Sequence, residues 1–148
     1  PTGPSNVPMS YSERMRVSYR DVDVMEHVNN AAYFTYMETV RCHYYMKVRD
    51  QTRPKDLDII VAAQSCRYLR GLVYDEVFDI HVWPSRIGNT SFTLSYAMRT
   101  IDGEIVATAE TVIVMFDYAK NAKKPVDAAL RTRLEADLAK GPSISLPE

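Results

Sequence analysis

One long helix, placed between a single strand and a group of strands, constrains the fold of this chain more than any other feature of its sequence. Apolar side chains recur across residues 30–48 with the spacing of one helix face, at Tyr33, Tyr36, Met37, Val40, Tyr44 and Val48. Phe34 and Met46 widen this stripe. Because so wide a stripe covers more than one side of a helix, we expect the rest of the fold largely to enclose it.

Alternating apolar and polar residues predict five strands around this helix. In the first strand, Met15, Val17 and Tyr19 alternate with polar residues, which is the period of a half-buried strand. Four more strands are expected, over residues 59–69, 76–83, 91–99 and 104–116. We expect Pro84 to end the strand before it, and Asp102 and Gly103 to form a two-residue hairpin turn.

A shorter helix is predicted near the end of the chain. Pro125 suits its first turn, and Leu130, Leu134 and Leu138 form one apolar ridge. The order of strand, long helix, four strands and short helix differs from the alternating order of a doubly wound α/β fold. It predicts the α+β class, with an antiparallel sheet wrapped around a long central helix.

Length and composition predict one domain. The 148 residues, 46% of them hydrophobic, suffice for one buried core but not for two ordinary domains. Prolines among small polar residues predict flexible tails over residues 1–10 and 141–148. The domain is therefore expected to cover residues 11–140.

The charge pattern argues against several kinds of partner. The formal net charge is -1 and the basic residues are scattered, so we expect no nucleic-acid partner and no membrane partner. Purely apolar runs such as residues 59–63 are far shorter than the roughly 20 residues that cross a bilayer. With no signal-peptide pattern, and with Cys42 and Cys66 in a predicted helix and strand, we expect a cytoplasmic protein with reduced thiols.

Common catalytic motifs are missing from the sequence. It contains no G-x-S-x-G elbow, and its 5 glycines are too scattered to build a phosphate-binding or dinucleotide-binding loop. Its 3 histidines and 2 cysteines show no metal-ligand spacing. We therefore expect neither a metal site nor a cofactor.

The most unusual segment joins the first strand to the long helix. Residues 19–33 concentrate acidic and amide side chains with a histidine, namely Asp21, Asp23, Glu26, His27, Asn29 and Asn30. One interpretation is a polar loop with a helix cap, because asparagine is a good cap residue and acidic residues suit the positive end of a helix. The other interpretation is a catalytic loop.

A family resemblance favours the catalytic interpretation. The run D-V-M-E-H-V-N-N at residues 23–30, followed by Ala32 and Tyr33 and by Glu38 near Arg41, resembles the signature of the 4-hydroxybenzoyl-CoA thioesterase family. It is most similar to the branch of long-chain acyl-CoA thioesterases that carries an H-V-N-N run, and residues 88–92 also resemble that family. The resemblance implies a hotdog fold. It further implies a homo-oligomer, a dimer or a dimer of dimers (a homotetramer), with each active site at a subunit interface.

The resemblance also implies roles for residues of this loop. Asp23 matches the family's catalytic aspartate, acting on an acyl-CoA substrate either as a nucleophile or as a general base on water. The backbone N–H of Asn30, at the positive end of the helix, would bind the thioester oxygen. A thiol has a pKa near 8.5, so CoA can leave as a thiolate without a strong general acid.

Other residues are candidates for substrate binding, each with a structural alternative. His27 can orient Asp23 or contact substrate, or it can hold the loop backbone. Tyr33 can line an acyl pocket or belong to the core. Arg86 can bind CoA phosphates or be a surface charge, and Ser91 follows the turn that resembles the family.

Two further alternatives stay open from the sequence. Glu38 is a second candidate for the catalytic carboxylate, although we expect it instead to pair with Arg41 or to interact near Cys42. The chain can also be a thioesterase that acts on acyl carrier protein, or a module that binds acyl-CoA without catalysis.

Overall fold

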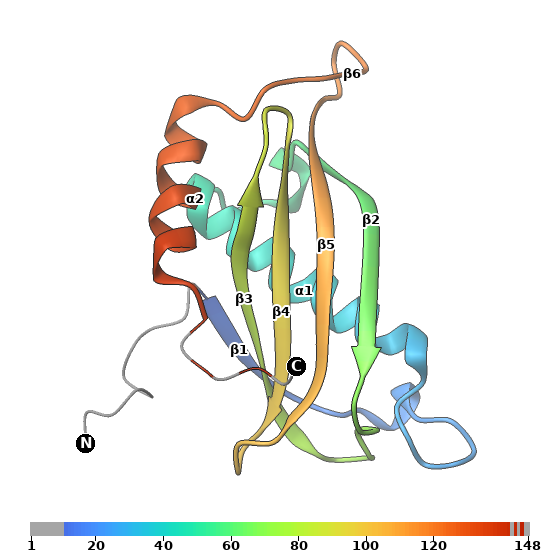
Figure 1. Ribbon diagram of the computed structural model, residues 1–148. Helices are drawn as coiled ribbons and strands as arrows, with labels where there is room; N and C mark the ends of the chain where they lie inside the picture. The colour runs from blue at the N-terminus through green and yellow to red at the C-terminus, as the bar shows by residue number, and fades with distance from the viewer. Residues whose placement is uncertain (1–10, 143, 145, 147–148) are drawn as a thin grey trace.

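An antiparallel sheet and two helices make up the protein, whose computed structural model describes residues 11–142, 144 and 146 (Figure 1). The main elements, in chain order, are β1 (Tyr11–Arg16), α1 (Asn30–Arg49), β2 (Ile59–Tyr68), β3 (Val77–Ile87), β4 (Ser91–Thr100), β5 (Ile105–Asp117), β6 (Ala122–Lys123) and α2 (Ala128–Lys140). Short 3-10 turns cover Tyr19–Asp21 and Pro54–Asp56. None of the described helices is long and apolar enough to cross a membrane.

The sheet curls around α1. Its strand order is β1-β3-β4-β5-β2, every neighbouring pair is antiparallel, and β6 pairs with the end of β5. Figure 1 shows α1 crossing behind the sheet, with α2 beside β3. This arrangement confirms the predicted α+β class and the hotdog fold, with an antiparallel sheet wrapped around a long helix.

The core lies between α1 and the face of the sheet that covers it. Met37, Val40 and Tyr44 of α1 are fully buried, and they meet strand residues that alternate with more exposed ones, as Phe92 and Leu94 do in β4. Burial of each such side chain contributes about 1.5–3 kcal/mol. The helix stripe and the strand alternation therefore stabilise the same interface.

Three local predictions were wrong. β1 ends at Arg16, and Tyr19 begins a 3-10 turn in which its side chain is exposed. β3 continues past Pro84, because the register with β4 shifts between Pro84 and Arg86 and such an irregularity accommodates a residue without an N–H group. The β4–β5 loop is longer than the predicted two-residue turn. It is closed by the bond from Thr100 N to Glu104 O at 2.8 Å, and Gly103 within it has a φ of 103°.

The second helix also differs in detail from the prediction. It begins at Ala128 behind the cap Asp127, whose side chain accepts from Leu130 N at 2.9 Å, so Pro125 precedes its first turn. Leu130 and Leu134 are buried, whereas Leu138 is 39% exposed. The predicted tail over residues 1–10 lies outside the described residues. Residues 143, 145, 147 and 148 of the second predicted tail, over residues 141–148, also lie outside them.

One buried hydrogen bond joins the two helices. Tyr44 Oη donates to Asp137 Oδ2 at 2.7 Å, and Arg133 Nε lies 3.3 Å from the same oxygen. Asp137 is only 1% exposed. A buried carboxylate needs such donors, because an unsatisfied one is costly.

We predict that Tyr44→Phe lowers the free energy of unfolding by about 1–3 kcal/mol, since the buried Asp137 loses the 2.7 Å bond from Tyr44 Oη while the ring stays in place. Urea denaturation measures this change. Tyr74→Phe is the matched control at an exposed tyrosine, and it should stay within about 0.5 kcal/mol of the wild type. Equal effects of the two substitutions would contradict a structural role for the bond between the helices.

Candidate active site

The loop before α1 is a tight, internally bonded turn. Val22 and Val28 form a β-bridge across it, and Asp23 N donates to His27 O at 2.9 Å. Glu26 N donates back to Asp23 O, also at 2.9 Å, with Glu26 in the left-handed region at φ 65°. These bonds hold the backbone of Asp23 in one place.

The carboxylate of Asp23 is exposed at the side of this turn. Its Oδ1 accepts from Met25 N at 2.9 Å, and no other described residue donates to it. Asp23 lines a hollow of about 620 Å³ together with Tyr19, Arg20, Val22, Val24 and Glu26. One carboxylate oxygen is therefore held by the loop while the other has no donor among the described residues.

The loop is fastened to the segment that precedes β3. Val28 N donates to Leu72 O at 2.8 Å, and His27 forms a β-bridge with Val73. The ring of His27 lies over Gly71, where a Cβ atom would come within 2.8 Å of its Cδ2. The structure gives the ring no hydrogen bond to Asp23 or to any other described residue, so His27 is positioned here by packing.

Asn29 is the N-cap of α1. Its Oδ1 accepts from Ala31 N at 2.8 Å, and its own N–H donates to Asp21 O at 2.8 Å. Within the described part of the chain, nothing accepts from the backbone N–H of Asn30. An open donor thus lies at the positive end of a 20-residue helix, where a negative charge is stabilised.

Three tyrosines support this helix start. Tyr36 Oη donates to Asp21 Oδ2 at 2.8 Å, and burial together with that carboxylate raises the pKa of Tyr36, which keeps it a donor. Tyr68 Oη, at the end of β2, donates to Asn30 O at 3.2 Å. Tyr33 is 1% exposed, its Oη accepts from Leu72 N at 3.1 Å, and its ring meets that of Tyr68 edge-on.

Sequence reasoning missed Gly71 and Tyr68. Neither belongs to the 23–30 motif, and both reach the loop only through strand pairing and chain reversal, which local patterns do not encode. The aromatic character of Tyr68 at a strand end was the sole available signal.

The other two predicted residues lie elsewhere in the chain. Arg86 and Ser91 line a separate hollow of about 270 Å³ at the turn between β3 and β4. His27 is bridged to Val73, before β3 begins, whereas Arg86 is near the end of this 11-residue strand. A strand of that length spans about 35 Å, so one chain does not bring Arg86 or Ser91 to Asp23.

The expected ion pair between Glu38 and Arg41 is not formed. Glu38 is exposed, and Arg41 is 5% exposed with its Nη1 directed at Tyr96 Oη, 3.4 Å away. The guanidinium of Arg41 turns toward Tyr96 of β4, whereas the side chain of Glu38, one turn earlier on the same flank of α1, stays exposed.

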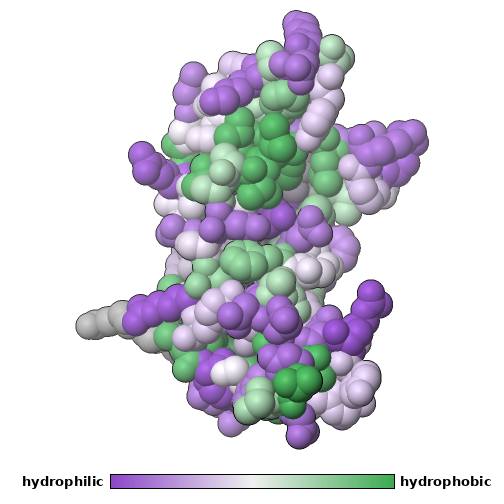
Figure 2. Space-filling model, turned by 90° about the vertical axis from the view of Figure 1, so that its right-hand side faces the viewer, coloured by the Kyte–Doolittle hydropathy of each residue, from purple (hydrophilic) through white to green (hydrophobic). Residues whose placement is uncertain are grey.

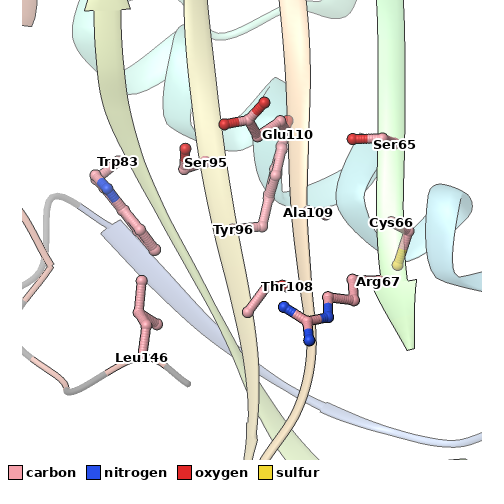
Figure 3. Close-up of a pocket in the computed structure, with 10 residues that line it drawn as sticks. All are labelled: Ser65, Cys66, Arg67, Trp83, Ser95, Tyr96, Thr108, Ala109, Glu110 and Leu146. Atoms are coloured by element: carbon pink, nitrogen blue, oxygen red, sulfur yellow. The ribbon is translucent and has the colours of Figure 1, made fainter. Parts of the chain in front are cut away.

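A further hollow, of about 330 Å³, lies on the outer face of the sheet (Figure 3). Ser95, Glu110 and Arg67 rise into it from β4, β5 and β2, while α1 lies behind the sheet. The sheet thus separates this hollow from the helix start. In the described chain, no three His, Cys, Asp or Glu side chains are grouped so that they could hold a metal ion.

We predict that Gly71→Ala destabilises the protein by about 1–3 kcal/mol, because the new methyl group collides with the ring of His27. The same substitution in a His27→Ala background should cost at least about 1 kcal/mol less. Urea denaturation of the four proteins of this cycle measures the coupling. Additive effects would mean that the ring does not pack on Gly71.

Comparison with known proteins places the chain in a family. Its sequence matches the thioesterase-like superfamily over residues 17–134. The Bacillus subtilis (strain 168) protein YsmA is 32% identical over 117 residues, which cover 79% of this chain and 78% of YsmA.

Solved structures agree with this placement. A thioesterase from Thermus thermophilus, solved with coenzyme A and Zn, has a TM-score of 0.79 and 25% identity. The alignment covers 88% of this chain and 96% of the Thermus chain. A Staphylococcus aureus protein solved with CoA has a TM-score of 0.83 but 15% identity, covering 93% of this chain and 89% of its own, so it supports the fold alone. Because the sequence match includes the loop, α1 and β2 to β5, the chain belongs to the thioesterase-like superfamily.

Proposed function

We propose that the protein hydrolyses acyl-CoA thioesters to a free carboxylic acid and CoA. The observation that carries this proposal is the loop that holds the Asp23 carboxylate beside a hollow and ends at the open N–H of Asn30. Membership of the thioesterase-like superfamily and a CoA-bound relative support the substrate class. Within the superfamily, we assign the chain to the 4-hydroxybenzoyl-CoA thioesterase family, in its branch of long-chain acyl-CoA thioesterases with the H-V-N-N run.

The loop supplies the two groups that thioester hydrolysis needs. As the carbonyl carbon is attacked, negative charge develops on its oxygen, and the N–H of Asn30 at the helix start stabilises it. The carbon–sulfur bond then breaks and CoA leaves as a thiolate, which needs no strong general acid.

Asp23 has two possible roles in this scheme. As a nucleophile, its carboxylate oxygen bonds to the carbonyl carbon and expels the thiolate, and water then hydrolyses the resulting anhydride to regenerate Asp23. As a general base, it takes a proton from the attacking water, which itself forms the new carbon–oxygen bond. In either route we assign the exposed His27 to substrate contact, and the buried Tyr33 to support of the helix start.

We propose that the protein works in the cytoplasm as a homo-oligomer, a dimer or a dimer of dimers. β2 is an edge strand, and Figure 2 looks onto this edge, where hydrophobic patches are exposed. If two copies pair antiparallel through β2, the opposite ends of their sheets become neighbours. Arg86 and Ser91 of one copy can then serve the CoA held at Asp23 of the other.

We predict that Asp23→Asn lowers kcat on acyl-CoA by about 10²–10⁴-fold. Asparagine keeps the oxygen that accepts from Met25 N, so the loop and the free energy of unfolding should be preserved. Thiol release from short, long and aromatic acyl-CoAs measures the loss, with Glu135→Gln on α2 as a control that leaves activity unchanged. An active Asp23→Asn variant would transfer the catalytic role to Glu38, which Glu38→Gln tests.

The same assay also decides between substrates. If the wild type releases no thiol from any acyl-CoA but cleaves acyl-carrier-protein thioesters, the CoA assignment is wrong. Tight binding of acyl-CoA with no turnover of either substrate would make the protein a binding module.

We predict that Asn29→Asp separates stability from catalysis at the helix start. Aspartate caps a helix as well as asparagine does, so the free energy of unfolding should stay within about 0.5 kcal/mol. Its charge, however, opposes the oxyanion next to Asn30 and should lower kcat by at least about tenfold. An unchanged kcat would show that the thioester oxygen binds elsewhere.

A further inference from the structure

Arg41 is a buried cation with no counter-charge in the described part of the chain. Its side chain is 5% exposed, and its only hydrogen bond to a described residue is the long one to Tyr96 Oη at 3.4 Å. No carboxylate among the described residues forms an ion pair with it, whereas a buried charge left unpaired costs several kcal/mol. The described residues therefore supply no negative charge that pairs with Arg41.

The contacts of α1 show which way Arg41 faces. One flank of the helix is used within the chain, because His43 Nδ1 lies 2.6 Å from Glu13 Oε2 of β1. On the other flank, Tyr45 bonds Asp58, which precedes β2, and Arg41 meets Tyr96 of β4. Because Arg41 lies four residues before Tyr45, it belongs to the same flank, the one toward β2, although its guanidinium reaches the central strand β4.

Glu38 lies on the same flank and is exposed. It precedes Arg41 by three residues, so the two side chains are neighbours along the helix, and both lie near the middle of the Asn30–Arg49 span. The two opposite charges nevertheless form no ion pair with each other. The described chain therefore has one free anion and one unpaired cation side by side near the β2 edge.

The β2 edge itself is open. β2 pairs with β5 on one side only, and Ile60, Val61 and Tyr68 are about 40% exposed along it. Figure 2 shows hydrophobic patches on this side of the molecule, interrupted by a hydrophilic band. A long apolar edge strand with unpaired backbone groups is a template for another strand.

Given the pairing of two copies through β2 that is proposed above, we infer that Glu38 of each copy neutralises Arg41 of the other. In a two-fold contact, if residue i of one copy meets residue j of the other, then j also meets i. A two-fold axis near the middle of α1 therefore forms both Glu38–Arg41 pairs at once. This inference rests on the homo-oligomer proposed above and names the charges that determine its geometry.

Single charge reversals test the inference. Glu38→Arg and Arg41→Glu should each raise the self-association Kd by at least about 100-fold, because each places like charges opposite one another at both contacts. In an equimolar mixture of the two variants, opposite charges meet again at both contacts. The mixture should therefore form heterodimers with a Kd within about tenfold of the wild type.

Sedimentation equilibrium and native mass spectrometry measure these constants. Glu135→Arg, on the exposed side of α2, is the matched charge-reversal control and should not change the Kd. If Arg41→Glu does not fold, Glu38→Gln should still weaken the dimer, and adding Arg41→Met to it should restore association, because no charge is then left unpaired.

The outcomes separate the charge pair from the association itself. A wild-type monomer at micromolar concentration would overturn both, and the counter-charge of Arg41 would then have to be a ligand. A wild-type dimer whose Kd is unchanged by either reversal would overturn the charge pair alone. Because the readout is mass, a failure of the proposed thioesterase activity would leave this result unaffected.

Discussion

The burial of α1 against the concave face of the sheet determines the rest of the structure. The helix has 20 residues and is about 30 Å long, which matches strands of 10 to 13 residues. Met37, Val40 and Tyr44 are inaccessible to solvent, so the sheet has to curl around them. With the helix fixed in this way, its N-terminus emerges beside the end of β2, and the loop that carries Asp23 has to close there.

The cap of α1 links stability to chemistry. Asn29 satisfies the N–H of Ala31, and Asp21 accepts from Asn29, so the first turn is anchored on both sides. The N–H of Asn30 is left open by the same arrangement. A cap that bonded all the first-turn donors would stabilise the helix further but would remove the donor that the proposed hydrolysis uses for its oxyanion.

Periodicity predicted the elements more accurately than their ends. The predicted helix ended at Val48 and the observed one at Arg49, because a wide apolar stripe is a local signal that packing reinforces. The predictions at Pro84, at the β4–β5 turn and at Leu138 were wrong, since strand register and helix contacts depend on partners distant in sequence. The predicted ion pair between Glu38 and Arg41 was wrong for the same reason. Their spacing makes them neighbours on the helix, but the guanidinium of Arg41 contacts Tyr96 of the sheet instead.

The site was predictable only in part, and its remaining part depends on strand pairing. The run at residues 23–30 indicated Asp23, His27 and Asn30, which one loop and the helix start hold together. Gly71 and Tyr68 reach the loop through tertiary contacts, and the predicted substrate residues Arg86 and Ser91 lie near the far end of β3. Which residues of a second copy approach Asp23 would follow from the register of the β2 edges.

An apolar edge alone specifies such a register weakly, because neighbouring registers bury similar surface and make similar backbone bonds. Buried charges discriminate more strongly, since a shifted register leaves Arg41 unpaired at a cost of several kcal/mol. A cation that destabilises the isolated chain would thereby select the one alignment in which the ends of two sheets meet correctly. The lack of a carboxylate partner for Arg41 among the described residues would then be the feature that lets two copies build a defined site.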